Sequence, residues 1–303
     1  MRTRRQPPPP DLADLLGSWQ LHLESEAKSE LTVKSYTGHV RAWLRWCEQT
    51  GRPAELTREL VQAHIAGMLT AGSEPNTARL RLASLRAFTR WLVADGEIDA
   101  DPLLGMRPPK LTTKVIESLT DDQLRLLLKA CQGKTLRDRR DEAIVRLMLE
   151  TGLRAGEVIA LQTTDLDLPR GLVTVRRGKG GKGRIAPFSS QAAAALDRYL
   201  RARRNHPRAQ DRPLWVGVGG KGFGYHGLND TLRDRARAAG IEGFHLHLLR
   251  HTAATRWLRA RGSEQGLMAV AGWSTRSMID RYTGASAAER AAAEARSLGL
   301  GEL

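Results

Sequence analysis

Two pairs of side chains, each three residues apart, could act together on a phosphate group. Arg154 and Glu157 lie in the segment TGLRAGEV, and His247 and Arg250 lie in the segment HLLR. Residues three apart on a helix project from the same side, and guanidinium groups bind phosphate oxygens through two parallel hydrogen bonds. Tyr282 adds a hydroxyl group that could attack phosphorus. Each feature alone could be an exposed helical ion pair or a packing tyrosine, but together they suit phosphoryl transfer without a metal ion.

The glycine- and lysine-rich run RGKGGKG, residues 177–183, invites comparison with loops that bind nucleotide phosphates. Those loops follow the pattern G-x-x-x-x-G-K-[ST] and open a helix. Residues 178–183 have the glycine spacing, but Arg184 and Ile185 stand where Lys and Ser or Thr are required. No helix is expected to follow. We therefore expect neither ATP nor any other cofactor.

A cluster of histidines raises the question of a metal site. His247 and His251 have the i, i+4 spacing that zinc sites use, and His245 lies beside them. However, no Glu lies between the pair, no Cys is near, and Arg250 would repel a cation. We expect no metal here. A serine hydrolase is not supported either, because the chain contains no G-x-S-x-G segment.

The candidate residues fall in a part of the chain whose pattern mixes helices with a β-hairpin. The β-prone runs 172–176 and 184–188 are joined by the glycine-rich run, which predicts a hairpin with a flexible tip. Thr120 followed by Gln123 forms a capping box for a helix that ends at Ala130. Apolar periodicity and stop residues predict further elements. These are helices over 139–150, 189–204, 228–239, 248–261, 264–271 and 275–282, and a strand-like run over 213–218.

The preceding part of the chain is predicted to be entirely helical. Helices are expected over 31–49, 57–70 and 76–94, each followed closely by a glycine. The third has no acidic residue from 76 to 93. A basic face of this kind is either simply solvated or laid against a phosphate backbone. Its arginines are Arg79, Arg81, Arg86 and Arg90.

Two prolines and weak periodicity mark residues 103–113 as a linker between folding units. The first 110 residues contain 15 basic and 13 acidic side chains, which leaves 33 and 20 for the rest, so the net charges are +2 and +13. We expect a helical domain over 12–102 and an α+β domain over 114–290. A proline-rich flexible tail, 1–11, precedes them, and a second tail, 291–303, follows.

The composition fits a folded chain with a polyanionic partner. Of 303 residues, 48 are Lys or Arg and 33 are Asp or Glu, a net charge of +15, although an Arg-rich coding bias would produce a similar count. A hydrophobic share of 41% excludes wholesale disorder, and no run approaches the roughly 20 apolar residues of a membrane span. Cys47 and Cys131 are too few and too distant for a disulfide framework, so a reducing cytoplasm is the natural setting.

Taken in order, the candidate residues resemble the signature of the tyrosine recombinase (phage integrase) family. The boxes span residues 151–283, and the helical first part resembles the family's core-binding domain. The family more often has His at the position of Trp273, and the hairpin offers Lys182 as an alternative to Lys179. The matching positions are Arg154, Lys179, His247, Arg250, Trp273 in AGW and Tyr282 in DRYT.

The resemblance implies a mainly α fold with a small β-hairpin or sheet, in which an all-helical core-binding domain precedes the catalytic domain. It implies a site-specific DNA recombinase that forms a covalent 3′-phosphotyrosyl intermediate on Tyr282, without metal or ATP. Arg154 and Arg250 would stabilise the phosphate. Lys179 would protonate the leaving 5′-oxygen. His247 would assist proton transfer at the tyrosine or hydrogen-bond the phosphate.

The same resemblance implies supporting residues and partners. Glu157 would orient the arginine next to it, and Trp273 would pack and hydrogen-bond rather than transfer a proton. Double-stranded DNA is the implied partner. So is the chain itself, a monomer or weak oligomer when free and a tetramer on paired sites, with an accessory directionality factor. We expect a cytoplasmic, nucleoid-associated protein. Further DNA-binding residues are expected on the third helix and the hairpin: Arg79, Arg81, Arg86, Arg90, Arg177, Lys182 and Arg184.

Two other functions stay open. A type IB topoisomerase shares the tyrosine nucleophile but rejoins the same strand, and a DNA-binding protein could keep the fold without catalysis. The tail 291–303 would either fold onto its own domain or, as the resemblance favours, dock on a neighbouring protomer. No additional amino-terminal arm-site domain is expected, which points to the simple two-domain, Xer- or Cre-like type.

Overall fold

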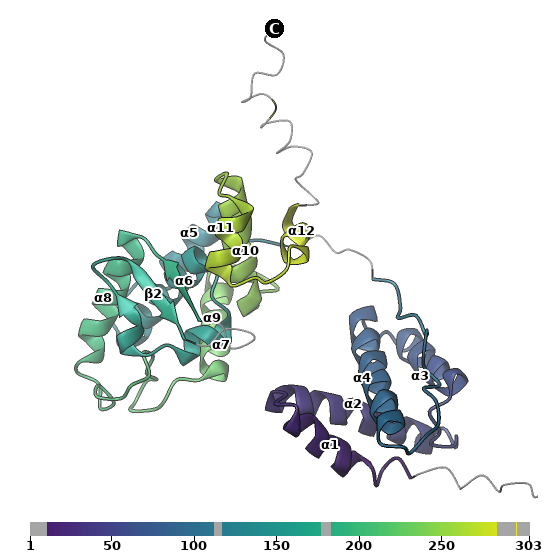
Figure 1. Ribbon diagram of the computed structural model, residues 1–303. Coiled ribbons are helices and arrows are strands. Elements are labelled where there is room, and N and C mark those ends of the chain that lie inside the picture. The colour runs from purple at the N-terminus through teal and green to yellow at the C-terminus, as the bar shows by residue number, and fades with distance from the viewer. Residues whose placement is uncertain (1–10, 112–116, 177–182, 284–294, 296–303) are drawn as a thin grey trace, which may run out of the picture. The chain divides into compact units, whose positions relative to one another are not determined.

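The computed structural model describes residues 11–111, 117–176, 183–283 and 295. The chain divides into two compact units, Met1–Thr113 and Lys114–Leu303 (Figure 1). Each unit buries its own hydrophobic core. Across the described ranges, no helix has the length and apolar character needed to cross a lipid bilayer.

The first unit is built from four helices, and its described residues, 11–111, contain no strand. The three expected helices are confirmed, each starting within one residue of its predicted position. Side chains cap two of them: the Ser29 hydroxyl accepts the N–H of Thr32, and the Thr57 hydroxyl accepts that of Leu60. The helices are α1 (Leu16–Ser25), α2 (Glu30–Gln49), α3 (Arg58–Thr70) and α4 (Pro75–Ala94).

Helix α1 was not expected from the sequence. Its N-cap residue, Leu15, makes no side-chain hydrogen bond, and its first turn has no acidic residue, so the usual start signals are missing. Packing holds it instead. Trp19 is buried in the core of the unit, with its ring centroid 4.8 Å from that of Phe88 on α4. Leu103 and Met106, in the segment expected as a linker, are buried in the same core.

The second unit combines helices with a three-stranded sheet. The expected helices are all present, and the capping box of Thr120 and Gln123 is confirmed at the start of α5. The elements are α5 (Asp121–Ala130), α6 (Leu136–Thr151), α7 (Ala155–Ala160), β1 (Leu166–Asp167), β2 (Leu172–Val175), β3 (Arg184–Pro187), α8 (Ser190–Arg203), α9 (Tyr225–Ala238), α10 (Leu246–Arg259), α11 (Glu264–Ala271) and α12 (Ser277–Thr283), with a 3₁₀ turn at Thr163–Asp165.

The sheet is antiparallel in the order β1-β2-β3, with Val173 opposite Ala186. The predicted hairpin of β2 and β3 is confirmed. Strand β1 was missed because its two residues are too few to show a pattern. The strand-like run expected over 213–218 is wrong, because its backbone forms only two isolated bridges, Gln162 to Pro213 and Val216 to Gly222.

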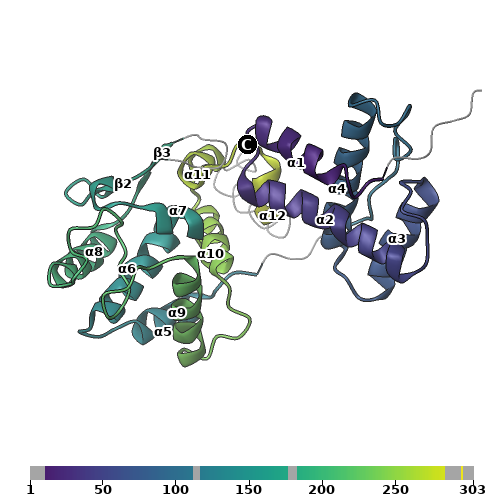
Figure 2. The same ribbon diagram turned by 90° about the horizontal axis from the view of Figure 1, so that it is seen from below.

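Helix α6 forms the centre of the second unit. Helices α8 and α10 pack against it (Figure 2), and Ile144, Leu147 and Met148 are among its fully buried side chains. Arg140 and Asp141 are buried as well, so side chains on most faces of α6 lie inside the unit. It starts three residues earlier than predicted because Thr135 and Asp138 form a second capping box. Helix α10 therefore packs against an element that the core encloses.

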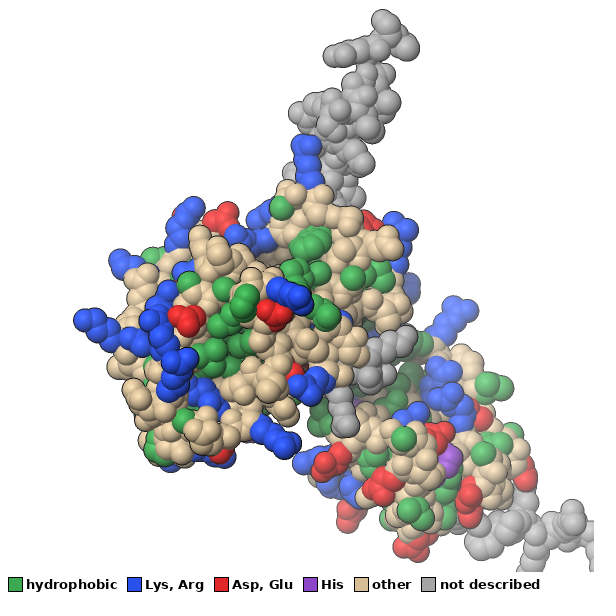
Figure 3. All heavy atoms as spheres, turned by 60° about the vertical axis from the view of Figure 1, so that its left-hand side comes forward, with side chains coloured by type: hydrophobic (Ala, Val, Ile, Leu, Met, Phe, Trp, Pro, Cys, Tyr) green, Lys and Arg blue, Asp and Glu red, His purple; other side chains and the backbone are tan. Residues whose placement is uncertain are grey.

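The surface of the second unit reflects its basic composition. On the face shown in Figure 3, Lys and Arg side chains project around this unit while acidic side chains are sparse, and the first unit shows more of the acidic ones. This agrees with the net charges of +13 and +2 for the two parts of the sequence.

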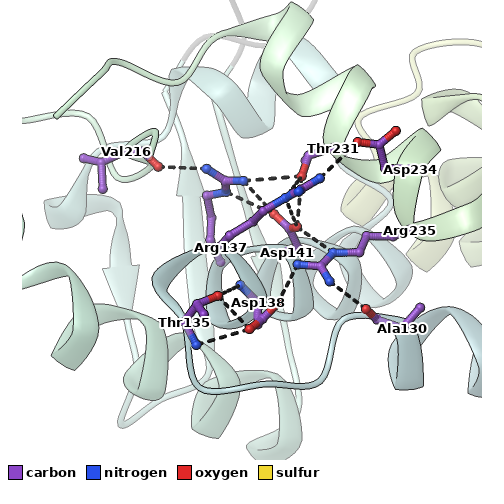
Figure 4. Close-up of polar contacts among 10 residues, drawn as sticks. Ala130, Thr135, Arg137, Asp138, Asp141, Val216, Thr231, Asp234 and Arg235 are labelled. Carbon is purple, nitrogen blue, oxygen red and sulfur yellow. Dashed lines mark hydrogen bonds and ion pairs between the residues drawn. The ribbon is translucent and has the colours of Figure 1, made fainter. Parts of the chain in front are cut away.

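A buried carboxylate ties α6 to α9. Asp141 is fully buried and accepts hydrogen bonds from Arg140 Nη2, Thr231 Oγ1 and Arg235 Nε, each 2.9 Å long (Figure 4). Arg235 also donates to Asp138 at 2.7 Å and to the carbonyl oxygen of Ala130 at 2.8 Å. A buried charge is tolerated only when it is paired and hydrogen-bonded. The network therefore holds α6 and α9 together, the two helices that directly precede α7 and α10 in the chain.

Candidate active site

Arg154 is placed by a tight turn between α6 and α7. Gly152 ends α6 in the left-handed conformation, with φ of 59°, and its N–H donates to the carbonyl oxygen of Met148. Arg154 then occupies the N-cap position of α7. Its backbone N–H donates to Glu157 Oε2 at 2.8 Å, and its Nη1 donates to Glu157 Oε1 at 3.0 Å. The structure thus brings Arg154 and Glu157 together as their spacing predicted.

Glu157 receives a second arginine from β3. Arg184 Nη1 and Nη2 donate to the two carboxylate oxygens of Glu157 at 2.9 and 2.7 Å, and Arg184 Nε donates to the carbonyl oxygen of Val270 at 2.8 Å. Burial raises the pKa of Glu157, but hydrogen bonds from Arg184 and from the backbone of Arg154 outweigh it and hold that pKa below its ordinary value. Arg184, expected to contact DNA, therefore directs these three donors into the protein.

Gly272 leaves the space that this arginine occupies. A β-carbon built on Gly272 would lie 2.8 Å from Arg184 Nη1, and the residue has φ of +65°, which disfavours other residues. The glycine of the AGW segment therefore leaves room for the ion pair between Arg184 and Glu157.

Arg250 lies on α10 with only 2% of its surface exposed. Its Nη1 donates to the carbonyl oxygen of Gly152, whereas its Nη2 is buried without a hydrogen-bond partner among the described residues. Burial and the positive charge of Arg154 lower the pKa of Arg250 to about 10. A buried N–H group that makes no hydrogen bond costs free energy. This donor and the adjacent positive charges are arranged for an anion.

Trp273 and Tyr282 stack on each other beside Arg250. Their ring centroids are 5.2 Å apart with an interplanar angle of 20°, and the Arg250 guanidinium carbon lies 5.3 Å from the Trp273 ring centroid. Trp273 is 7% exposed and shares a small core with Leu258 and Ile279. These contacts agree with the packing role expected for Trp273.

Helix α10 also supplies the histidines of the site. His247 is exposed, and its ring centroid lies 4.6 Å from that of His251 at an angle of 89°. His251 Nδ1 is hydrogen-bonded to the Tyr282 hydroxyl group. Sequence reasoning weighed His251 only as a metal ligand and missed this contact. The sequence signal that could have indicated this contact was the position of His251, directly after Arg250 and one helical turn beyond His247. No cluster of metal-ligating side chains occurs in the part of the chain that the structure describes.

Lys179, expected in the catalytic site, and Arg177 and Lys182, expected to bind DNA, lie outside the described residues. The four arginines of α4 are described. Arg79 Nη1 donates to the carbonyl oxygen of Pro109 at 2.7 Å, and Arg86 Nη1 donates to that of Met106 at 3.4 Å. These two side chains hold the segment that follows the helical domain.

The other two arginines of α4 differ in exposure. Arg90 is exposed, and its Nε donates to the carbonyl oxygen of Arg86 at 3.1 Å. Arg81 is half-buried, and its Nε finds no hydrogen-bond partner among the described residues. The four therefore do not form one uniform solvated face.

Both units match models of known protein families. The model of the phage integrase family matches residues 117–289, and the model of the phage integrase N-terminal SAM-like domain matches residues 16–96. The tyrosine recombinase XerC of Chromobacterium violaceum is 31% identical over 268 residues, which cover 86% of this chain and 87% of the relative. XerC of Azotobacter vinelandii is 33% identical, with coverage of 82% and 83%.

Solved structures show the same fold. The XerA recombinase is 26% identical with a TM-score of 0.51, covering 90% of this chain and 94% of its own. A lambda integrase tetramer bound to a Holliday junction is 17% identical with a TM-score of 0.67, covering 87% and 77%. The expected fold, helical core-binding domain followed by catalytic domain, is confirmed. The chain belongs to the phage integrase family of tyrosine recombinases.

Proposed function

We propose that this recombinase cuts DNA by attack of the Tyr282 hydroxyl oxygen on the scissile phosphate, forming a covalent 3′-phosphotyrosyl bond and a free 5′-hydroxyl. The observation that carries the proposal is the buried, unpartnered Nη2 of Arg250 in a site that stacks Tyr282 on Trp273. A phosphate oxygen would satisfy that donor. Negative charge grows on the non-bridging oxygens during attack, and preorganised donors stabilise it.

Two arginines would share the phosphate. Arg154 is held by Glu157 and lies close enough to Arg250 to lower the pKa of that residue. Two guanidinium groups side by side repel each other in the free protein, and an anion between them removes the repulsion. Their forked donors match two phosphate oxygens. We therefore assign both arginines to the non-bridging oxygens.

The proton steps need further groups. Lys179 would protonate the leaving 5′-oxygen, and His247, exposed on α10, would hydrogen-bond the phosphate. The phosphotyrosyl bond keeps the free energy of the broken phosphodiester, so a 5′-hydroxyl of a second strand can reverse the step without ATP. Strand exchange follows when that hydroxyl comes from the other DNA site.

Duplex DNA is the proposed substrate, bound largely through the basic second unit. Affinity that depends on phosphate contacts falls steeply with salt concentration. Lambda integrase has been solved as a tetramer on a Holliday junction, and we propose the same assembly for this chain on paired sites, with a directionality factor selecting integration or excision. The protein would act in the cytoplasm on the nucleoid.

A nicked substrate that traps the covalent intermediate tests the nucleophile. The wild-type protein is expected to form a protein–DNA adduct, and Tyr282→Phe is expected to bind the same DNA without forming one. An adduct with Tyr282→Phe would refute the assignment. Relaxation of a supercoiled plasmid without exchange between two sites would favour a topoisomerase instead.

A further inference from the structure

The hydroxyl group of Tyr282 is held by a histidine that the family signature does not assign. His251 Nδ1 on α10 is hydrogen-bonded to the Tyr282 hydroxyl on α12, across 31 residues of chain. Trp273 stacks on the tyrosine ring at the same time. The phenol is therefore fixed both at its ring face and at the oxygen atom that would attack.

The phenol has to lose a proton to become a good nucleophile, because a free tyrosine has a pKa of about 10. Glu157 is not suited to accept it. Its two carboxylate oxygens already accept four hydrogen bonds, two from Arg154 and two from Arg184, which fill the lone pairs of a carboxylate. Arginine side chains offer donors only. Arg250 and Arg154 can therefore not take the proton either.

Two histidines of α10 carry basic ring nitrogens in the described part of the site, and they differ in position. His251 is half-buried and touches the tyrosine oxygen, whereas His247 is exposed one helical turn earlier, with its ring perpendicular to that of His251. A base must lie within hydrogen-bond reach of the proton it abstracts. The contact of Nδ1 with the tyrosine hydroxyl satisfies this for His251.

We propose that His251 is the catalytic base that takes the proton of Tyr282 during DNA cleavage, a role that rests on the proposed action of Tyr282 as nucleophile. The proton moves from the tyrosine oxygen to Nδ1 of a neutral imidazole that carries its own hydrogen on Nε2. The oxygen lone pair forms the bond to phosphorus. The bond from phosphorus to the 5′-oxygen breaks, and that oxygen keeps the electron pair and takes a proton from the general acid.

Rejoining runs the same transfers backwards. A 5′-hydroxyl attacks phosphorus and gives its proton to the general acid, now acting as a base. The bond from phosphorus to the tyrosine oxygen breaks, and the imidazolium of His251 returns its proton to that oxygen. No other reactant is needed, because each proton that leaves in cleavage returns in ligation.

Two substitutions separate proton transfer from positioning. His251→Asn keeps an acceptor oxygen near the place of Nδ1 but is not a base, and His251→Ala removes both functions. With single-turnover cleavage of a nicked substrate, both variants are expected to lose about 100-fold or more in rate, the usual contribution of a general base, while binding the DNA as the wild type does. His245→Asn is the matched control, because His245 is exposed and its ring centroid lies 6.5 Å from that of His251. It is expected to cleave at the wild-type rate.

A second substrate excludes action on the leaving group. Sulfur in place of the bridging 5′-oxygen leaves as a thiolate, which needs no proton because a thiol is much more acidic than an alcohol. The His251 variants are expected to stay slow on it.

Cleavage by His251→Asn within a few-fold of wild type, or recovery of either variant on the sulfur substrate, would overturn the proposal. If His251→Ala fails to bind DNA, His251→Asn decides alone. Loss of the adduct in these variants is distinct from failure of the nucleophile assignment, which only an adduct with Tyr282→Phe would reveal.

Discussion

Arg184 of β3 and Glu157 of α7 form a two-point ion pair across 27 residues of chain, with N–O distances of 2.9 and 2.7 Å. The same carboxylate holds Arg154. The ion pair thereby links the base of the hairpin to the arginine assigned to the phosphate, and Arg184 Nε extends the link to Val270 on α11. Three segments that are distant in sequence are thereby joined around the Glu157 carboxylate.

Arg184→Ala is expected to slow cleavage at least about tenfold without changing the salt dependence of DNA binding. Its loss frees Glu157 to move, which misplaces Arg154, and small misplacements of catalytic groups are costly. Each lost phosphate contact would instead make the negative slope of log K against log salt less steep by about 0.9. Titrations at several salt concentrations, together with cleavage rates, distinguish the two roles. A less steep slope with an unchanged rate would restore the DNA-binding role expected from the sequence.

Replacing Arg250 with Lys is expected to reduce the cleavage rate about 100-fold or more while DNA binding is retained. A lysine offers a single charged point and cannot donate both to Gly152 and to a phosphate oxygen in the way that the guanidinium fork does. Arg259→Lys is the matched control, because Arg259 is exposed on the last turn of the same helix. Single-turnover cleavage of a nicked substrate measures both variants. Equal rates for Arg250→Lys and wild type would contradict the assignment.

Local signals in the sequence were sufficient for much of the fold. The capping box of Thr120 and Gln123 predicted the start of α5, and β-prone runs on both sides of a glycine-rich segment predicted the hairpin. The pair of Arg154 and Glu157 was predictable because the two residues lie three apart at the start of one short helix. These features depend only on residues that are close together in the sequence, so they can be predicted without knowing the tertiary structure.

The contacts that cross the chain were not predictable in the same way. Arg184 has the sequence context of a basic hairpin residue, and its contact with Glu157 depends on the pairing of β3 with β2 and on the space that Gly272 leaves. His251 reads as a partner of His247 at helical spacing, and its contact with Tyr282 depends on how α12 returns to α10. A sequence pattern contains no information about which surfaces meet after such a turn.

The carboxylate of Asp141 is expected to be among the most important single groups for the stability of the second unit. Asp141→Ala would leave Arg140, which is 2% exposed, and the partly buried Arg235 without their shared partner. Breaking a buried ion pair by removing one member costs about 3–5 kcal/mol. Urea denaturation is expected to show a loss of that order in the free energy of unfolding. Asp122→Ala removes an exposed pair with Arg125 and is expected to cost less than about 1 kcal/mol. Similar losses for the two variants would contradict the prediction.

The stability of the helical domain is expected to fall as the pH is lowered from 6.5 to 4. Burial and the positive charge of Arg81 lower the pKa of His64 to about 4, and both ring nitrogens are buried without a hydrogen-bond partner among the described residues. Between these pH values the unfolded chain binds a proton at His64 that the folded chain does not, so unfolding becomes more favourable as the pH falls. The full effect is about 3 kcal/mol.

Hydrogen exchange of the amides in α3 and α4, measured on the whole chain, is expected to show this loss in the wild type and a smaller one in His64→Phe. His226→Phe, a substitution of an exposed histidine in the other unit, should leave the pH dependence of these amides unchanged. An equal pH dependence in His64→Phe and the wild type would show that another group is responsible.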